Sequence, residues 1–116
     1  IPSAEIHFVH ATIPFEWPQG TFDCVVLSET GYYLSRSQLL DTLEKIDGST
    51  TVRFVLVLCH WRGEIDDWPL DAYEVHRICL GAWPHHRVEH RYEGDYRLDI
   101  ITVDKDFRPA ASEGHA

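Results

Sequence analysis

Thr21–Leu34 reads Thr-Phe-Asp-Cys-Val-Val-Leu-Ser-Glu-Thr-Gly-Tyr-Tyr-Leu, and this stretch decides the fold. Its apolar run, Cys24–Leu27, does not alternate with polar residues, which is typical of a strand buried on both faces of a sheet. The run ends in the polar cluster Ser28–Gly31, and Tyr32 and Tyr33 follow. Because open parallel α/β sheets bind ligands at the carboxyl ends of their strands, the sequence predicts a functional site at this turn.

The composition is that of one folded domain: 116 residues, 44% of them hydrophobic, with four tryptophans. Ten basic and nineteen acidic residues give a net charge of −9, which argues against a nucleic-acid partner. The sequence shows neither a signal-peptide pattern nor an apolar run near the ~20 residues that span a bilayer, so we expect no membrane contact and a cytoplasmic location. Cys24, Cys59 and Cys79 have no paired spacing, and we expect buried free thiols in a reducing compartment.

A strand–helix–strand unit is predicted around the central run. Apolar residues at helical spacing predict a helix over Ser35–Ile46, and Ser35 with Gln38 forms a capping-box pattern. Gly48 is predicted to end that helix in a left-handed conformation. Val52–Leu58 is a second buried strand, and the short helical crossover predicts that it runs parallel to the first.

Four further segments flank this unit. Ile6–Val9 is predicted to be a short strand that leads into a proline-rich turn. Asp71–Leu80 is predicted to be a second helix with a cap-like acidic pair at its start. Arg87–Tyr92 and Tyr96–Val103 are predicted to form a hairpin across a glycine-containing turn.

The pattern Phe-Asp-x-Val-Val-Leu-Ser-Glu-x-x-Tyr-Tyr-Leu at Phe22–Leu34 resembles the fourth strand of class I S-adenosylmethionine (SAM)-dependent methyltransferases. Within His60–His76, the order His-Trp-Arg, Asp-Asp, Pro-Leu and Val-His resembles the loop after the fifth strand in the branch that includes the nodulation protein NodS. The resemblance extends over about Ile6–Val103 and covers only the later half of such an enzyme. It implies an incomplete Rossmann-like α/β sheet with a parallel core and a C-terminal antiparallel hairpin. Residues 1–103 would form this partial domain, and residues 104–116 a flexible tail.

The family's glycine-rich turn, Gly-x-Gly-x-Gly, does not occur in the sequence. We therefore expect that this chain alone does not hold SAM in the usual way. The family's strand order, 3-2-1-4-5-7-6, would leave the edge of strand 24–28 open, which invites self-association. Three explanations stay open: the chain is part of a longer enzyme, it closes its edge by self-association, or Ile6–Val9 pairs with the central strand. We favour the first two, because a four-residue strand is a weak cover for so apolar an edge.

The resemblance implies methyl transfer from SAM to a small-molecule acceptor, and the NodS branch suggests an amine on a sugar-like molecule. Glu29 is a catalytic candidate because a carboxylate can attract an amine or accept its proton; the structural alternative is a solvated or capping acid. His60 is the second catalytic candidate, because its intrinsic pKa suits a base near neutrality. Arg62 would pair with an acidic group of the substrate or with Asp66 or Asp67. For both His60 and Arg62 the alternative is a purely structural loop clamp.

The remaining candidates lie beside these residues. Those expected to line the acceptor site are Tyr32, Tyr33, Trp61 and Arg62, with one of the two tyrosines belonging to the core. Those expected to contact the cofactor are Thr12, at the corner where the family commonly has an aspartate beside the adenine, and Ser28.

We expect no metal site, because neighbouring histidines on an extended segment point to opposite faces. A function of another class stays open, namely a catalytically silent methyltransferase-like domain that binds a partner or a small ligand.

Overall fold

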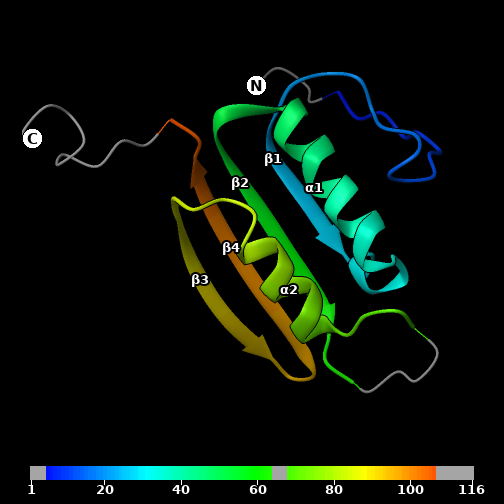
Figure 1. Ribbon diagram of the computed structural model, residues 1–116, viewed down its shortest axis with the longest axis vertical. Coiled ribbons are helices and arrows are strands. Elements are labelled where there is room, and N and C mark those ends of the chain that lie inside the picture. Colours follow the sequence, from blue (N-terminus) through cyan, green and yellow to red (C-terminus); the bar gives the residue numbers. More distant parts are fainter. Residues whose placement is uncertain (1–4, 64–67, 107–116) are drawn as a thin grey trace, which may run out of the picture.

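The computed structural model describes residues 5–63 and 68–106 and forms one α/β layer structure (Figure 1). The elements are, in order, β1 (Phe22–Ser28), the 3-10 helix η1 (Gly31–Tyr33), α1 (Arg36–Ser49), β2 (Thr50–Trp61), α2 (Ala72–Leu80), β3 (His86–Glu93) and β4 (Tyr96–Asp104). The sheet order is β1-β2-β4-β3, with β1 parallel to β2 and the other two pairs antiparallel. This confirms the predicted fold class, a parallel pair followed by a C-terminal hairpin.

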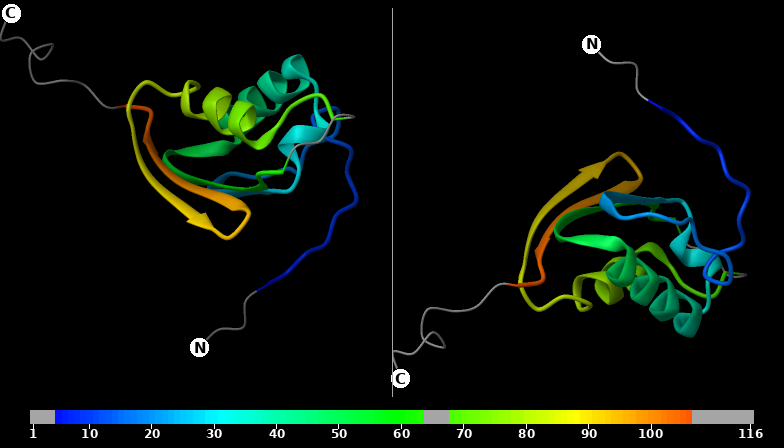
Figure 2. Two further views of the ribbon diagram at one scale, coloured as in Figure 1. Left: turned by 90° about the horizontal axis from the view of Figure 1, so that it is seen from below. Right: turned by 90° about the horizontal axis from the view of Figure 1, so that it is seen from above.

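Both helices cover the same face of the sheet, and the two views of Figure 2 show the other face without a helix. Side chains alternate along β2, so Phe54, Leu56 and Leu58 point to the helices and are buried, whereas Val55 and Val57 on the opposite face are only partly buried. We call these the covered face and the open face. The core therefore lies entirely between the covered face and the helix layer.

Both helices begin at the predicted caps. Ser35 accepts the backbone N–H of Gln38 and completes a capping box at the start of α1, and Asp71 does the same with Glu74 at the start of α2. These predictions are confirmed.

The predicted end of α1 at Gly48 is wrong, because the helix continues to Ser49. Its last carbonyl groups have other partners. The hydroxyls of Ser49 and Thr50 and the ammonium group of Lys105 all donate to carbonyl oxygens of the final turn. With these acceptors paired, the helix ends without a left-handed residue.

The prediction that strand 24–28 is buried on both faces is also wrong. Leu27 is buried, but Val26 is 59% exposed and Cys24 is exposed, because β1 is an edge strand and helices cover only one of its faces. The expected burial of the thiols accordingly holds for Cys79, while Cys59 is half-buried.

Ile6–Val9 does not form the predicted strand, and the side chains of Ile6, Phe8 and Val9 are exposed. In the described part of the chain β1 pairs with β2 alone, so the segment does not close the edge of the sheet. A four-residue segment can form only a few ladder hydrogen bonds, so strand pairing would stabilise it little.

At the other end of the chain, β4 includes Asp104, and the backbone N–H of Lys105 donates to the carbonyl of Val52. Asp104 and Lys105, which were assigned to the predicted tail, are therefore held by the sheet, and residues 107–116 lie outside the described part. None of the described helices is long and apolar enough to cross a membrane.

Candidate functional site

The carboxyl ends of β1 and β2 meet at one edge of the sheet, as predicted. Ser28 is in register with Cys59, and the backbone N–H of Glu29 donates to the carbonyl oxygen of Cys59 over 2.9 Å. Glu29 and His60 therefore lie at the same end of the sheet, on neighbouring strands.

Glu29 has an unusual backbone conformation, with φ at 55°. This left-handed region is disfavoured for residues other than glycine and persists where surrounding contacts enforce it. The contacts here come from its carboxylate, which accepts the backbone N–H of Trp61 over 2.7 Å and the hydroxyl of Tyr32. Because a carboxylate has about four acceptor positions, the half-buried Glu29 retains capacity for a further donor.

The two tyrosines have different surroundings. Tyr32 is fully buried, and its burial, followed by its hydrogen bond to Glu29, raises the pKa of its hydroxyl above the ordinary value. Tyr33 is 54% exposed. The ring of Trp68 contacts both, with centroid separations of 4.5 Å to Tyr32 and 4.3 Å to Tyr33. Tyr32 is thus the core member of the pair, and Tyr33 with Trp68 forms an aromatic surface against Tyr32, the tyrosine that contacts Glu29.

His60 does not lie on an open rim as expected, because β2 continues through Trp61 and turns the imidazole to the covered face. The side chain is fully buried. Its Nε2 accepts the backbone N–H of Gly31 over 3.0 Å, and its Nδ1 lies 2.9 Å from Nε2 of His76. Burial lowers the pKa of His60 to about 3. Neither ring nitrogen is open to a substrate in this geometry.

His76 links His60 to a buried carboxylate that sequence reasoning missed. Nδ1 of His76 lies 2.8 Å from Oδ2 of Asp99, and Nε of Arg97 donates to the same oxygen over 3.1 Å. His90 contacts the other oxygen of Asp99. Burial alone would raise the pKa of Asp99, but the hydrogen bonds from His76 and His90 and the charge of Arg97 outweigh it and lower the pKa to about 2.

Arg62 points away from Glu29, toward the hairpin. Its backbone N–H donates to the backbone carbonyl of Asp95, its guanidinium donates to the carbonyl of Gly94 over 2.9 Å, and the guanidinium lies 4.6 Å from the ring centre of Tyr92. The partners expected for it, Asp66 and Asp67, lie outside the described residues.

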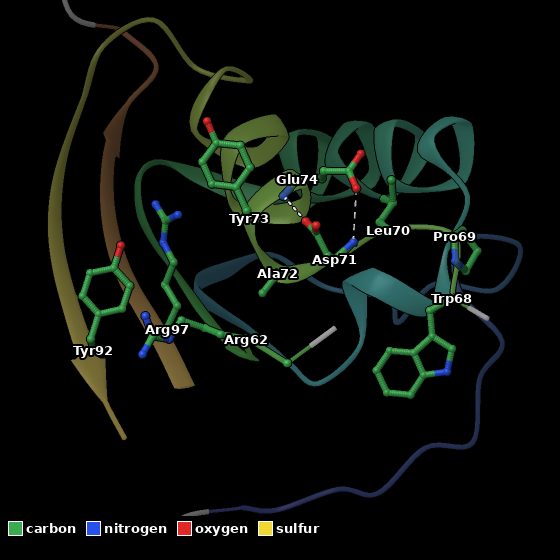
Figure 3. Close-up of a pocket in the computed structure, with 11 residues that line it drawn as sticks. Arg62, Trp68, Pro69, Leu70, Asp71, Ala72, Tyr73, Glu74, Tyr92 and Arg97 are labelled. Atoms are coloured by element: carbon green, nitrogen blue, oxygen red, sulfur yellow. Dashed lines mark hydrogen bonds between the residues drawn. The ribbon is translucent and has the colours of Figure 1, made fainter. Parts of the chain in front are cut away.

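A cavity of about 560 Å³ lies between this end of the hairpin and the start of α2 (Figure 3). Arg62 and Arg97 line it from the sheet, and Tyr73 and Tyr92 stand on either side of the two arginines in the close-up. Its lining combines these cationic and phenolic groups with the acidic side chains of Asp71 and Glu74, which suits a polar ligand.

A second hollow of about 330 Å³ runs along the exposed edge of β1. Ile13 and Leu27 line it, so the two expected cofactor residues, Thr12 and Ser28, are each adjacent in sequence to a lining residue. Both are exposed, and the hydroxyl of Thr30, which also lines the hollow, donates to the carbonyl of Ser28. We call this hollow the β1 groove; its lining shares no residue with the cavity of Figure 3.

Within residues 5–63 and 68–106, no group of three or more histidine, cysteine, aspartate or glutamate side chains is arranged to hold a metal ion.

Comparison with solved structures finds the same fold in two bacterial proteins. One is described as a "putative Methyltransferase from Pseudomonas syringae" and is 33% identical, with a TM-score of 0.65. The match covers 79% of this chain and 54% of that one, so this chain spans about half the length of the relative. The other is an O-methyltransferase family protein from Burkholderia thailandensis, 15% identical with a TM-score of 0.58, matched over 76% of this chain and 32% of its own.

No protein-family model and no curated protein matches the sequence. Both matches to solved structures extend over about three quarters of the chain or more, with TM-scores above 0.5. The chain therefore has the fold of part of a Rossmann-like methyltransferase domain.

Proposed function

We propose that the protein is a SAM-dependent methyltransferase, that these 116 residues form the later half of its catalytic domain, and that it acts in the cytoplasm. We also propose a small-molecule acceptor, with an amine as the first class to test. The relative from Pseudomonas syringae supports the reaction type, because the match extends over most of this chain at 33% identity.

The observation that carries the proposal is the conformation of Glu29. Its left-handed backbone and two anchored carboxylate oxygens fix an anionic group at the carboxyl end of β1. A fixed carboxylate attracts an amine, orients its lone pair and accepts the proton that the nitrogen loses on methylation. Tyr33 and Trp68 would form the wall against which the acceptor packs.

The family's strand order would place the missing first strand on the edge of β1, so the nucleoside part of the donor is proposed to bind only at the end of the β1 groove nearest the carboxyl end of β1. Thr12 and Ser28 supply hydroxyls at the margin of the groove. When bound, SAM supplies a methyl group activated by a sulfonium. The proposal also requires a glycine-rich turn that the printed sequence does not contain.

The polar cavity of Figure 3 is the proposed place for the remainder of the acceptor. Arg62 and Tyr92 face it and would bind an acidic or hydroxylated part of that molecule. The backbone N–H of Trp61 donates to the Glu29 carboxylate, whereas the side chain of Trp61 lies on the open face of β2.

The test is SAM binding by calorimetry, followed by transfer of a labelled methyl group to a panel of amines, with the full native polypeptide. We expect binding, and a fall in kcat of about 100-fold or more for Glu29→Gln, because general-base catalysis contributes about 10²–10⁴. Asp23→Asn is the matched control, since Asp23 is an exposed acid at the other end of β1. Absence of SAM binding, or equal losses in the two variants, would overturn the proposal.

A second candidate function, self-association, is favoured by the unpaired edge of β1 and the exposed Val26 beside it. A second copy would add its own edge strand and cover the open face. We expect sedimentation to show a concentration-dependent dimer that Val26→Lys abolishes. Leu40→Lys on the outer surface of α1, where Leu40 is 45% exposed, should leave it intact. A monomer at every concentration would exclude this candidate.

A further inference from the structure

We propose that Asp99, His76 and His60 form a directional hydrogen-bond relay that holds Glu29 in its left-handed conformation. These three side chains would be positioning residues for the reaction, although none of them touches the acceptor. The link to catalysis rests on the proposed function, whereas the relay itself can be tested without any methyl transfer.

The direction of the relay follows from one backbone donor. The N–H of Gly31 can only donate, so Nε2 of His60 must accept and carry no proton. The remaining ring proton of His60 then lies on Nδ1 and is donated to Nε2 of His76. His76 in turn carries its proton on Nδ1 and donates it to the ionised carboxylate of Asp99. These tautomers are assigned from the hydrogen-bond network, and every bond in it points toward Asp99.

The relay reaches Glu29 from two sides. Gly31, which donates to His60, lies two residues after Glu29 in the same turn. Trp61, which follows His60 in β2, supplies the N–H that the Glu29 carboxylate accepts. A shift of His60 would therefore disturb the turn that follows Glu29 and also the backbone N–H that the Glu29 carboxylate accepts.

Packing leaves the turn little room to adopt another position. A Cβ atom added at Gly31 would lie 2.5 Å from a methyl group of Val75 in α2 and 3.2 Å from Nε2 of His60. The ring of Tyr32 also packs edge-on against His60, with the centroids 5.0 Å apart. The turn is thus clamped between α2 and β2, and the relay provides the polar contacts of that clamp.

An additional proton on either imidazole ring would break one hydrogen bond of the relay, because two donors would then face each other. Protonated His60 would direct an N–H at the N–H of Gly31, and protonated His76 would direct one at the Nδ1–H of His60. The geometry therefore requires both rings to be neutral. In contrast, a merely buried pair of histidines would leave the tautomers undetermined.

The experiment is ¹⁵N NMR of the imidazole rings at pH 7, together with amide hydrogen exchange in two variants of the full chain. We expect the ring proton on Nδ1 in both His60 and His76. His76→Leu removes the donor and the acceptor, whereas His76→Gln can supply both. We expect His76→Leu to accelerate exchange at Gly31 and Trp61 by about tenfold or more relative to Leu56. His76→Gln should restore most of that protection.

Exchange relative to Leu56 separates positioning from stability, because a general loss of stability would accelerate all three amides together. His90→Gln is the matched control, since His90 contacts the other oxygen of Asp99 and lies outside the relay. It should leave Gly31 and Trp61 unchanged. A proton on Nε2 of His60, or equal effects of His76→Leu and His90→Gln, would overturn the relay. If His76→Leu does not fold, the tautomers of the natural protein decide the question, whether or not methyl transfer is ever detected.

Discussion

The two faces of the sheet differ in burial and in polar contacts, although side chains pointing to one face and to the other alternate along the same strands. On β4, Ile101 is 1% exposed under the helices, while the adjacent Ile100 lies half-buried on the open face. The covered face also contains the histidine–aspartate relay, and within the described residues every buried side-chain nitrogen and oxygen has a hydrogen-bond partner. The open face presents Cys24 and Val26 to solvent. The side-chain contacts that stabilise the fold are therefore concentrated on the covered face.

The largest expected difference between the faces comes from two ion pairs of similar length. Arg97 and Asp99 approach to 3.1 Å on the covered face, and Arg91 and Glu89 approach to 2.9 Å in solvent. We expect Asp99→Ala to lower the free energy of unfolding by about 3–5 kcal/mol, because it leaves a nearly buried guanidinium unpaired. Glu89→Ala should leave the urea midpoint unchanged. Similar midpoints for the two variants would contradict the comparison.

The next largest difference in stability between the two faces comes from side-chain packing alone. Ile101→Ala should cost about 3 kcal/mol, since it opens a cavity under the helices. Ile100→Ala removes the same atoms from a half-covered position and should cost less than about 1.5 kcal/mol. Chemical denaturation of both variants measures the difference. Equal costs would mean that the open face is packed in solution, as self-association predicts, and the pair should then be measured again at lower protein concentration.

The local elements could be predicted from the sequence because their causes are local. The caps at Ser35 and Asp71 depend on residues three positions apart, and the parallel pairing of β1 with β2 follows from the helix between them. The burial of β1 could not be predicted, because an apolar run does not show what packs against it. The family pattern correctly suggested an open edge, but only the structure shows that a whole face is open.

The site was predicted in part. Glu29 and His60 were expected at one end of the sheet, and they lie there. The exposure of His60 was misjudged because polar residues after an apolar run were interpreted as the end of the strand. A signal was present, since His60 continues the alternation of Leu56 and Leu58, and Asp99 has the same phase as Ile101. Polar residues in phase with a buried stripe are candidates for a paired network.

A pH titration provides the third prediction. Below its ordinary value of 6.5, His60 takes up a proton in the unfolded chain but not in the folded one, where its pKa is lowered to about 3. Stability is thus complete above pH 6.5 and is lost as the pH falls toward 3. Between pH 6.5 and pH 5 we expect a loss of about 2 kcal/mol from this group.

The charged and titratable groups packed around His60 are Tyr32 from η1, His76 from α2, and Asp99 and Arg97 from β4. Asp99, with a pKa of about 2, stays ionised throughout this interval. Denaturation of the natural protein and of His60→Asn at each pH isolates the contribution. If stability falls with pH in parallel for the two proteins, the pKa of His60 is the same in the folded and the unfolded chain, and the prediction fails.

The smallest change in stability is expected at two glycines that pack against neither face of the sheet. A Cβ atom at Gly48 or at Gly94 would meet nothing within 4 Å, so packing contributes nothing at either site. Gly94 has φ at 59° in the hairpin turn, while Gly48 lies inside α1 and is not among the described glycines with positive φ. Gly94→Ala should therefore lose about 1–2 kcal/mol from backbone strain. Gly48→Ala should gain about 0.5–1 kcal/mol, because alanine restricts the unfolded chain and favours the helix.

The sign of the Gly48 effect tests where α1 ends. If the helix stopped at Asp47 with a left-handed glycine, as the sequence pattern predicts, Gly48→Ala would destabilise the protein as Gly94→Ala does. Thermal denaturation of the two variants distinguishes the cases, because their melting temperatures should move in opposite directions. Because an added Cβ touches nothing at either position, the two shifts would report backbone conformation alone. Side-chain packing would then matter chiefly on the covered face.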